Sequence, residues 1–223
     1  MAMPAVDEGK LNQAIGQVLN DLGGAASVAL VRMGDALGLY KTLHDKGGMT
    51  CEELASTAKV HPRYLREWLA QQTASDYLTY DQATKKFALP AEFAMMFAIE
   101  DSPVAMMGAF DGIVAWSDAQ PRVLEAFKNG GGVSWGDYGP CLFCSTARFF
   151  RPGYLHNLVQ NWLPALDGVV AKLSKGAKVG DVGCGHGGRR SSWRGPSPTR
   201  NSPVTTSTRA RSMPMAPTPA STM

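Results

Sequence analysis

The composition of the chain changes abruptly at residue 189, and this change limits how much of the sequence can fold. The last 35 residues, 189–223, contain six arginines and no lysine, aspartate or glutamate, and 25 of them are Arg, Ser, Thr or Pro. Such a segment lacks the apolar side chains needed for a core, so we expect a disordered tail. The folded part of this 223-residue chain is therefore expected within residues 1–188, enough for one large domain or two modest ones.

The charge of the protein follows the same division. The whole chain carries a formal net charge of +3, from 22 Lys and Arg against 19 Asp and Glu. Without the six arginines of the tail, 16 basic residues remain against the same 19 acids, so residues 1–188 carry a net charge of −3. Nucleic-acid binding relies on a basic surface, so a nucleic-acid partner is disfavoured.

The sequence gives no signal for export or membrane insertion. Residues 1–21 lack the positive start and apolar run of a secretory signal, and no stretch approaches about 20 uninterrupted apolar residues. Four cysteines are too few for a disulfide framework in a chain of this length, which agrees with a reducing compartment. We expect a cytoplasmic protein with no membrane partner.

The first 44 residues predict two helices. Apolar residues recur at helical spacing over residues 11–22 and again over residues 26–44. Gly23 and Gly24 lie between these runs, so we expect one helical run to end there and a second to begin.

Residues 50–89 have the pattern of a winged helix. Thr50 followed three places on by Glu53 predicts a capping box at the start of a short helix. A second helix starts at His61, and two β-prone pieces follow it. Helix, turn, helix and hairpin together predict a winged-helix-like helical domain. The expected segments are a helix ending near Lys59, a helix over 63–75, strands at 77–80 and 86–89, and a domain spanning 1–100.

Residues 101–168 predict a helical linker or substrate-covering region. The apolar, Met-rich run over 91–116 indicates two helices with a break near Pro103, and such methionines usually pack a core. A glycine-rich loop is expected at 128–140 and an amphipathic helix at 147–166.

The periodicity then changes from helix to strand. Residues 175–182 predict a short strand that enters a run of closely spaced glycines. Glycines let backbone N–H groups approach a ligand, and the N-terminus of a following helix attracts negative charge, so this is a signal for a nucleotide site. Gly183, Gly185 and Gly188 also fit the dinucleotide pattern G-x-G-x-x-G, which is weak on its own.

A fuller motif at this junction resembles that of a known family. The string is Asp181-Val182-Gly183-Cys184-Gly185-His186-Gly187. It resembles the D/E-x-G-x-G-x-G first motif of class I S-adenosylmethionine-dependent methyltransferases, several groups of which carry a helical N-terminal extension for dimerisation or substrate covering. The resemblance implies S-adenosyl-L-methionine as cofactor, a small-molecule methyl acceptor and a possible homodimer through the N-terminal helical domain. The implied cofactor-binding residues are Asp181, Gly183, Cys184, Gly185, His186 and Gly187.

These patterns together define the expected fold class. We expect a mainly α chain, with a winged-helix-like N-terminal domain followed by the start of an incomplete Rossmann-like α/β methyltransferase domain. That start is the first strand and glycine-rich loop, residues 169–188. A complete domain needs further strand–helix units and an acidic residue after the second strand to hold the ribose hydroxyls, and the tail has neither. The chain is therefore expected to be a non-functional fragment of a methyltransferase.

A reading-frame change would explain the interruption, and a genuine basic tail is the alternative. Residues 196–209 can be encoded so that the frame starting at the third base reads FPNSQFAGYDFHA. That string looks like a second strand ending in an acidic residue, which is what a methyltransferase should show next. We favour the interpretation that residues 189–223 are an out-of-frame tail.

Two other functions stay open on the residues alone. The helix over 63–75 could contact DNA, which would make the protein a winged-helix transcription regulator. The glycine pattern could serve an NAD-dependent oxidoreductase instead. The basic residues available for DNA contacts are Lys59, His61, Arg63 and Arg66.

Other reactive residues have simpler interpretations. Cys141 and Cys144 form a C-x-x-C pair, but zinc needs four ligands and the sequence has no second pair, so we expect packed or loop thiols and no metal. No residue is assigned a catalytic role, because a general base is identified by its distance to a substrate proton. Candidates to face a substrate are Trp116, Tyr138 and His156.

Overall fold

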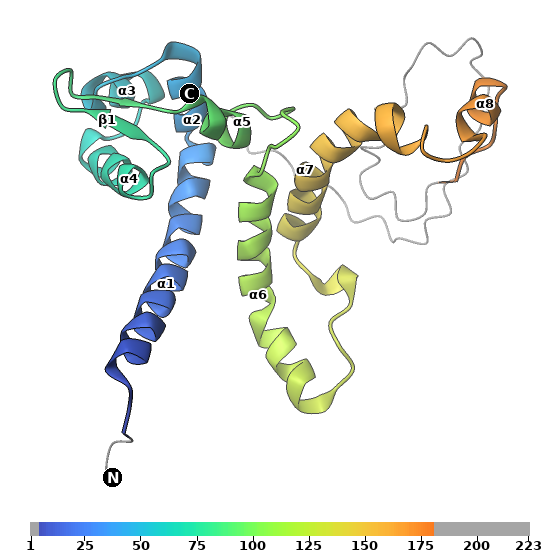
Figure 1. Cartoon of the computed structure of the whole chain (residues 1–223), viewed down its shortest axis with the longest axis horizontal. Helices are drawn as coiled ribbons and strands as arrows, with labels where there is room; N and C mark the ends of the chain where they lie inside the picture. The colour runs from blue at the N-terminus through green and yellow to red at the C-terminus, as the bar shows by residue number, and fades with distance from the viewer. Residues whose placement is uncertain (1–4, 181–223) are drawn as a thin grey trace, which may run out of the picture.

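The computed structural model describes residues 5–180 of the chain. Figure 1 shows a small winged-helix body at one end of a long first helix, with a second long helix beside that helix and a third beside the second. Within the described range the only sheet is a two-stranded hairpin, so the molecule is mainly α as expected.

The first helix, α1 (Glu8–Ala36), is continuous through Gly23 and Gly24. The expected break at these glycines is therefore wrong. Each glycine costs about 1 kcal/mol of helix propensity, but helical bonding continues on both sides and the C-terminal part of α1 is fixed by packing. The chain turns instead at Gly38, whose φ of 66° lies in the left-handed region, and α2 (Leu39–Lys46) begins there.

The next two helices begin where the sequence predicts. The hydroxyl of Thr50 accepts from the Glu53 amide at 3.2 Å, and the Thr50 amide donates to the Glu53 carboxylate at 2.8 Å, which completes the capping box of α3 (Cys51–Ala58). The helix α4 (Pro62–Ala74) has proline at its first turn, where the missing N–H costs nothing.

A short antiparallel hairpin completes the winged helix. Strand β1 (Thr79–Asp81) pairs with β2 (Lys86–Ala88), and Met49 forms a bridge with Phe87 on the other side of β2. This bridge ties the segment before α3 to the wing. The pairing of β1 with β2 confirms the expected hairpin, although β1 starts at residue 79 and not at 77.

The core of this body joins α1, α2 and α4. The Trp68 indole N–H donates to the carbonyl oxygen of Leu30 at 2.8 Å, so α4 is fixed to α1. At Gly34 the helices approach so closely that a Cβ would lie 2.5 Å from the Trp68 ring and 2.7 Å from the Tyr40 ring. Other buried members of the core include Val31, Leu39, Leu43, Leu54, Leu65, Leu69 and Phe97.

A segment without helix or strand separates the winged helix from the next long helix. Helix α5 (Ala91–Phe97) ends the first body, residues 98–106 form the linker, and α6 (Met107–Asn129) follows. The break expected near Pro103 lies in this linker and is confirmed. The loop at 130–139 contains one 3₁₀ turn, η1 (Trp135–Asp137).

The helix α7 (Pro140–Asn157) packs along α6. It begins seven residues before the expected start at residue 147, because proline is favoured in the first helical turn. A Cβ at Gly108 of α6 would lie 2.4 Å from the Phe149 amide nitrogen and 2.7 Å from the Ser145 carbonyl oxygen. The absence of a side chain at Gly108 therefore sets how closely the two helices approach.

The last described segments lead toward the glycine motif. Helix α7 passes into a π-helical turn, η2 (Leu158–Trp162), and a short helix, α8 (Val169–Ser174), follows. Residues 175–180 are neither helix nor strand, so the strand expected there is not formed in the described part. A strand needs a hydrogen-bonding neighbour, and residues 5–180 provide none for this segment.

Candidate functional site

The residues expected to hold the cofactor lie outside the described part of the chain. The structure describes the approach to them, through α8 and the exposed or half-buried residues 175–180. The expected residues outside the described range are Asp181, Gly183, Cys184, Gly185, His186 and Gly187.

An arginine on α7 lies at the centre of an ion-pair cluster. The Arg148 guanidinium donates to Asp35 at the end of α1 with distances of 2.6 and 3.0 Å. It donates to Glu100 in the linker at 2.8 Å through two nitrogens, and to Asp111 of α6 at 3.4 Å. Arg32 of α1 also donates to Asp111, at 2.8 Å. We call these five residues the Arg148 cluster.

The Arg148 cluster is partly buried, and its carboxylates stabilise the charge of Arg148. The side chains of Arg148 and Asp111 are each 25% exposed. Hydrogen bonds with Glu100 and Asp35 raise the pKa of Arg148 above its ordinary value, although burial acts in the opposite direction. Arg148 therefore stays charged across the physiological pH range.

Two more side chains of α7 hold the same linker. Arg151 pairs with the Asp101 carboxylate at 2.8 Å, and the His156 Nε2–H donates to the Asp101 carbonyl oxygen at 2.6 Å. His156, a candidate to face a substrate, is thus used in holding residues 98–106.

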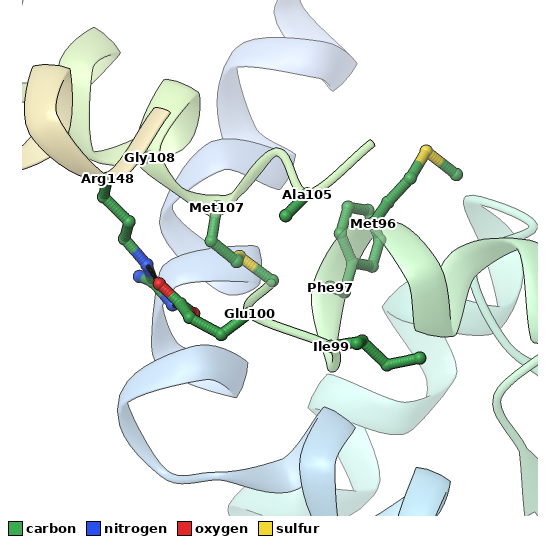
Figure 2. Close-up of a pocket in the computed structure, with 8 residues that line it drawn as sticks. All are labelled: Met96, Phe97, Ile99, Glu100, Ala105, Met107, Gly108 and Arg148. Atoms are coloured by element: carbon green, nitrogen blue, oxygen red, sulfur yellow. Dashed lines mark hydrogen bonds and ion pairs between the residues drawn. The ribbon is translucent and has the colours of Figure 1, made fainter. Parts of the chain in front are cut away.

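Two hollows flank Glu100. Figure 2 shows the first, a cavity of about 10 Å³ in which Glu100 and Arg148 meet beside apolar side chains such as Phe97 and Met107. The second is an open groove of about 420 Å³ between the α1–α2 corner and the end of α5. Most of the charged side chains of the groove are already paired, Asp35 with Arg148 and Lys41 with Asp45. We therefore do not assign the groove as a ligand site.

Aromatic side chains gather along α7 and η2. Phe150 lies between Phe149 and Tyr154, with ring centroids 5.2 and 6.4 Å away, and Tyr154 meets Trp162 edge-on at 5.8 Å. Phe149, Phe150 and Trp162 are exposed although they are large and apolar. The amphipathic helix expected here carries an aromatic face, which precedes α8 and the glycine motif in the chain.

The other two substrate-facing candidates lie apart from this aromatic face. Trp116 is an exposed residue of α6, and Tyr138 follows η1 with its ring 6.2 Å from that of Trp135. In the structure Trp116, Tyr138 and His156 do not contact one another and do not line a common site.

Three of the four basic residues considered for DNA contacts have partners within the winged helix. The Nδ1 of His61 accepts from the Arg63 amide at 3.2 Å as an N-cap, while Arg63 pairs with Glu67 on α4. Arg66 lies 3.6 Å from Glu52. These pairings reduce the positive potential that a recognition helix needs.

The two cysteines whose side chains the structure describes lie in different settings. Cys51 is buried at the start of α3, and Cys144 is a free, exposed residue on α7 rather than part of a loop. Within residues 5–180 no group of three or more His, Cys, Asp or Glu side chains could hold a metal ion.

The N-terminal part of α1 and the outer end of α6 expose apolar side chains. On α1 these recur at helical spacing, and Leu19 and Leu22 are each 61% exposed. By length and composition α1 could also cross a membrane, although its C-terminal part is in the winged-helix core. The exposed apolar residues are Leu11, Ile15, Val18, Leu19 and Leu22 on α1, with Trp116, Leu124 and Phe127 on α6.

Comparison with known proteins identifies the first body and then the wider fold. Residues 25–98 match the family described as Rv2258c-like winged HTH domain, so the predicted winged helix is confirmed. A comparison with curated proteins found no significant match.

Solved structures of methyltransferases share the fold. The mitomycin 7-O-methyltransferase MmcR matches with a TM-score of 0.61 and 21% identity, over 83% of this chain and 56% of that one. Human N-acetylserotonin methyltransferase in complex with SAM matches with a TM-score of 0.54 and 16% identity, over 86% and 57%. PigF with SAH matches with a TM-score of 0.55 and 17% identity, over 79% and 53%.

These matches show the fold of the described residues. That fold is shared with the covered part of solved S-adenosylmethionine-dependent methyltransferases, so the resemblance read from the sequence is confirmed at the level of fold. The chain spans little more than half the length of these solved structures.

The Arg148 cluster is the feature that the sequence did not predict. Two of its acids, Glu100 and Asp111, were visible as interruptions of the apolar run before and within α6, as was the neighbouring Asp101. Arg148 and Arg151, one turn apart on α7, were the matching signal. Pairing partners 37 to 113 residues apart requires the three-dimensional packing of the helices.

Proposed function

We propose that this chain is the N-terminal portion of an S-adenosylmethionine-dependent methyltransferase that transfers a methyl group to a small-molecule acceptor. The observation that carries the proposal is the order of parts. A body with the fold of methyltransferase N-terminal domains leads through α7 and α8 directly to the D-x-G-x-G-x-G string at 181–187. An NAD-dependent oxidoreductase or a DNA-binding regulator has no comparable support.

The cofactor proposal rests on the chemistry of the motif. Three glycines without Cβ atoms allow close backbone approach, and the carboxylate of Asp181 can accept hydrogen bonds from an ammonium group. S-adenosyl-L-methionine supplies an activated methyl group, and transfer then depends mainly on how the protein aligns the acceptor with it. The exposed aromatic face of α7 and η2 is our proposal for part of the acceptor side.

The test measures cofactor binding to a protein expressed from a gene in which the reading frame is restored after the codon for Gly187. Titration calorimetry should show S-adenosyl-L-methionine binding, which Asp181→Ala weakens about ten- to a hundredfold through loss of charged hydrogen bonds. Asp167→Ala, at an exposed acid before α8, is the control and should leave binding unchanged. Binding of NAD in place of S-adenosyl-L-methionine would overturn the proposal.

We also propose that the 223-residue chain itself is inactive. Residues 189–223 offer no apolar pattern for the remaining strands of a Rossmann-like domain, so little of the cofactor pocket would form. Calorimetry on this chain should show negligible S-adenosyl-L-methionine binding, and tight binding would refute the statement. Sequencing the gene across the codons for Gly187 to Arg190 tests the reading frame, and absence of an open alternative frame downstream would exclude a frameshift.

We propose that the N-terminal domain pairs with a second copy of the chain, and that the protein is cytoplasmic. The exposed apolar stripe on α1 is the main support, because such a surface is unfavourable in water. Light scattering should give twice the 23.8 kDa chain mass, and Leu19→Glu should yield monomer while Gln17→Glu on the same helix should not. A monomeric parent chain, or flotation with lipid vesicles, would contradict dimerisation through this stripe.

A further inference from the structure

The described chain contains two bodies that differ in how they pack, and α6 lies against α1 where they meet. The winged helix has an apolar core that includes Leu54, Leu69 and Trp68. The α6–α7 pair packs instead through small residues, since Gly108, Gly112 and Ala115 of α6 are buried. Met107 alone of the α6 residues belongs to the buried winged-helix core, with Phe110 packed against it.

Charged side chains span the boundary between the bodies. Arg32 and Asp35 lie on α1, and their partners Asp111 and Arg148 lie on α6 and α7. Glu100 lies in the linker that connects the bodies and pairs with the same Arg148. The end of α1, the linker and α7 therefore meet at the guanidinium group of Arg148.

The charge balance makes this junction sensitive to Arg148. With its two arginines against three carboxylates, the Arg148 cluster carries a net charge of −1. Without Arg148 the balance is −2, and Asp35, Glu100 and Asp111 repel one another in a partly buried setting. Losing Arg148 therefore removes attraction and adds repulsion across the same boundary.

We propose that the Arg148 cluster is an electrostatic latch that holds the α6–α7 pair against the winged helix. Opening the latch loosens the linker at 98–106 and frees α6 and α7 to move while the winged helix stays folded. Because α7 leads into η2 and α8, the latch sets the position of these elements relative to the winged helix.

Hydrogen exchange of the full chain tests the latch by comparing two reporter regions. In the linker, the Met106 amide donates to the Met96 carbonyl oxygen at 3.0 Å, and the Ser102 amide donates to that of Ile99. Arg148→Met should speed exchange of these amides about tenfold or more, while amides of α3 and α4 stay within about twofold. The matched control is Arg63→Met, which removes an exposed arginine and its ion pair on α4.

Two further measurements separate a latch from a purely structural residue. In Arg148→Lys, which keeps the charge, the linker amides should exchange at about the rate of the parent protein. Adding Glu100→Gln to Arg148→Met should partly restore slow exchange, because it removes one of the carboxylates that repel one another. Raising NaCl from about 0.05 to 0.5 M should speed linker exchange in the parent and slow it in Arg148→Met.

The proposal is overturned by either of two outcomes. Faster exchange in α3 and α4 together with the linker would show that Arg148 supports the whole fold. Unchanged linker exchange in Arg148→Met would show that apolar packing and the other polar contacts, such as Arg151 with Asp101, hold the two bodies together without Arg148.

Discussion

Replacing Gly108 by alanine should force α6 and α7 apart. The new Cβ would lie 2.4 Å from the Phe149 amide nitrogen, 2.7 Å from the Ser145 carbonyl oxygen and 2.8 Å from the Phe149 Cα. All three are backbone atoms of α7, so no side chain can rotate to make room. Overpacking typically costs about 1–3 kcal/mol, and the upper end applies to a rigid backbone neighbour. Alanine regains about 1 kcal/mol of helix propensity, so the net loss should be about 2 kcal/mol.

Urea unfolding followed by circular dichroism measures this loss. The control is Gly112→Ala on the same face of α6, where the nearest atom is the Ser145 hydroxyl oxygen at 3.6 Å, an ordinary contact distance. That substitution should be neutral or stabilising by up to about 1 kcal/mol, because only the propensity gain remains. Equal stability of the two variants would refute the close approach of α6 to α7.

Three smaller predictions concern the winged helix. Thr50→Ala should cost about 1 kcal/mol by removing one half of the capping box, measured by thermal unfolding. Gly34→Ala should destabilise by about 1–3 kcal/mol, because its Cβ would meet the packed rings of Trp68 and Tyr40. The hydrogen bond from the Thr50 backbone amide lowers the pKa of Glu53 below its ordinary value of 4.5. The ionised carboxylate therefore stabilises the fold above about pH 4.5, and this stabilisation is lost as the pH falls through the lowered pKa. The Tm difference between the parent and Glu53→Ala should therefore be present at neutral pH and shrink in acid, and a difference independent of pH would contradict this.

The winged helix was predictable because its signals are local. Thr50 and Glu53 identify a helix start within four residues, and the proline after His61 marks the next. The unbroken α1 was not predictable, since Gly23 and Gly24 are local signals for a break, whereas the packing that fixes the helix lies further along, around Val31 and Gly34.

The candidate site was predictable only in its chemistry. The motif at 181–187 indicates a nucleotide site from glycine spacing alone, but the strand expected at 175–182 depends on neighbours that no local pattern supplies. The Arg148 cluster was hidden for a related reason, because Asp35 and Arg148 meet only after α1 and α7 are both placed.

The continuity of α1 through Gly23 and Gly24 has a mechanical consequence. At 1.5 Å per residue its 29 residues form a rod about 43 Å long. One end carries the exposed apolar stripe, and the other carries Arg32 and Asp35. A rotation of the N-terminal part of α1, where the apolar stripe lies, would therefore also displace Arg32 and Asp35, which hold α6 and α7.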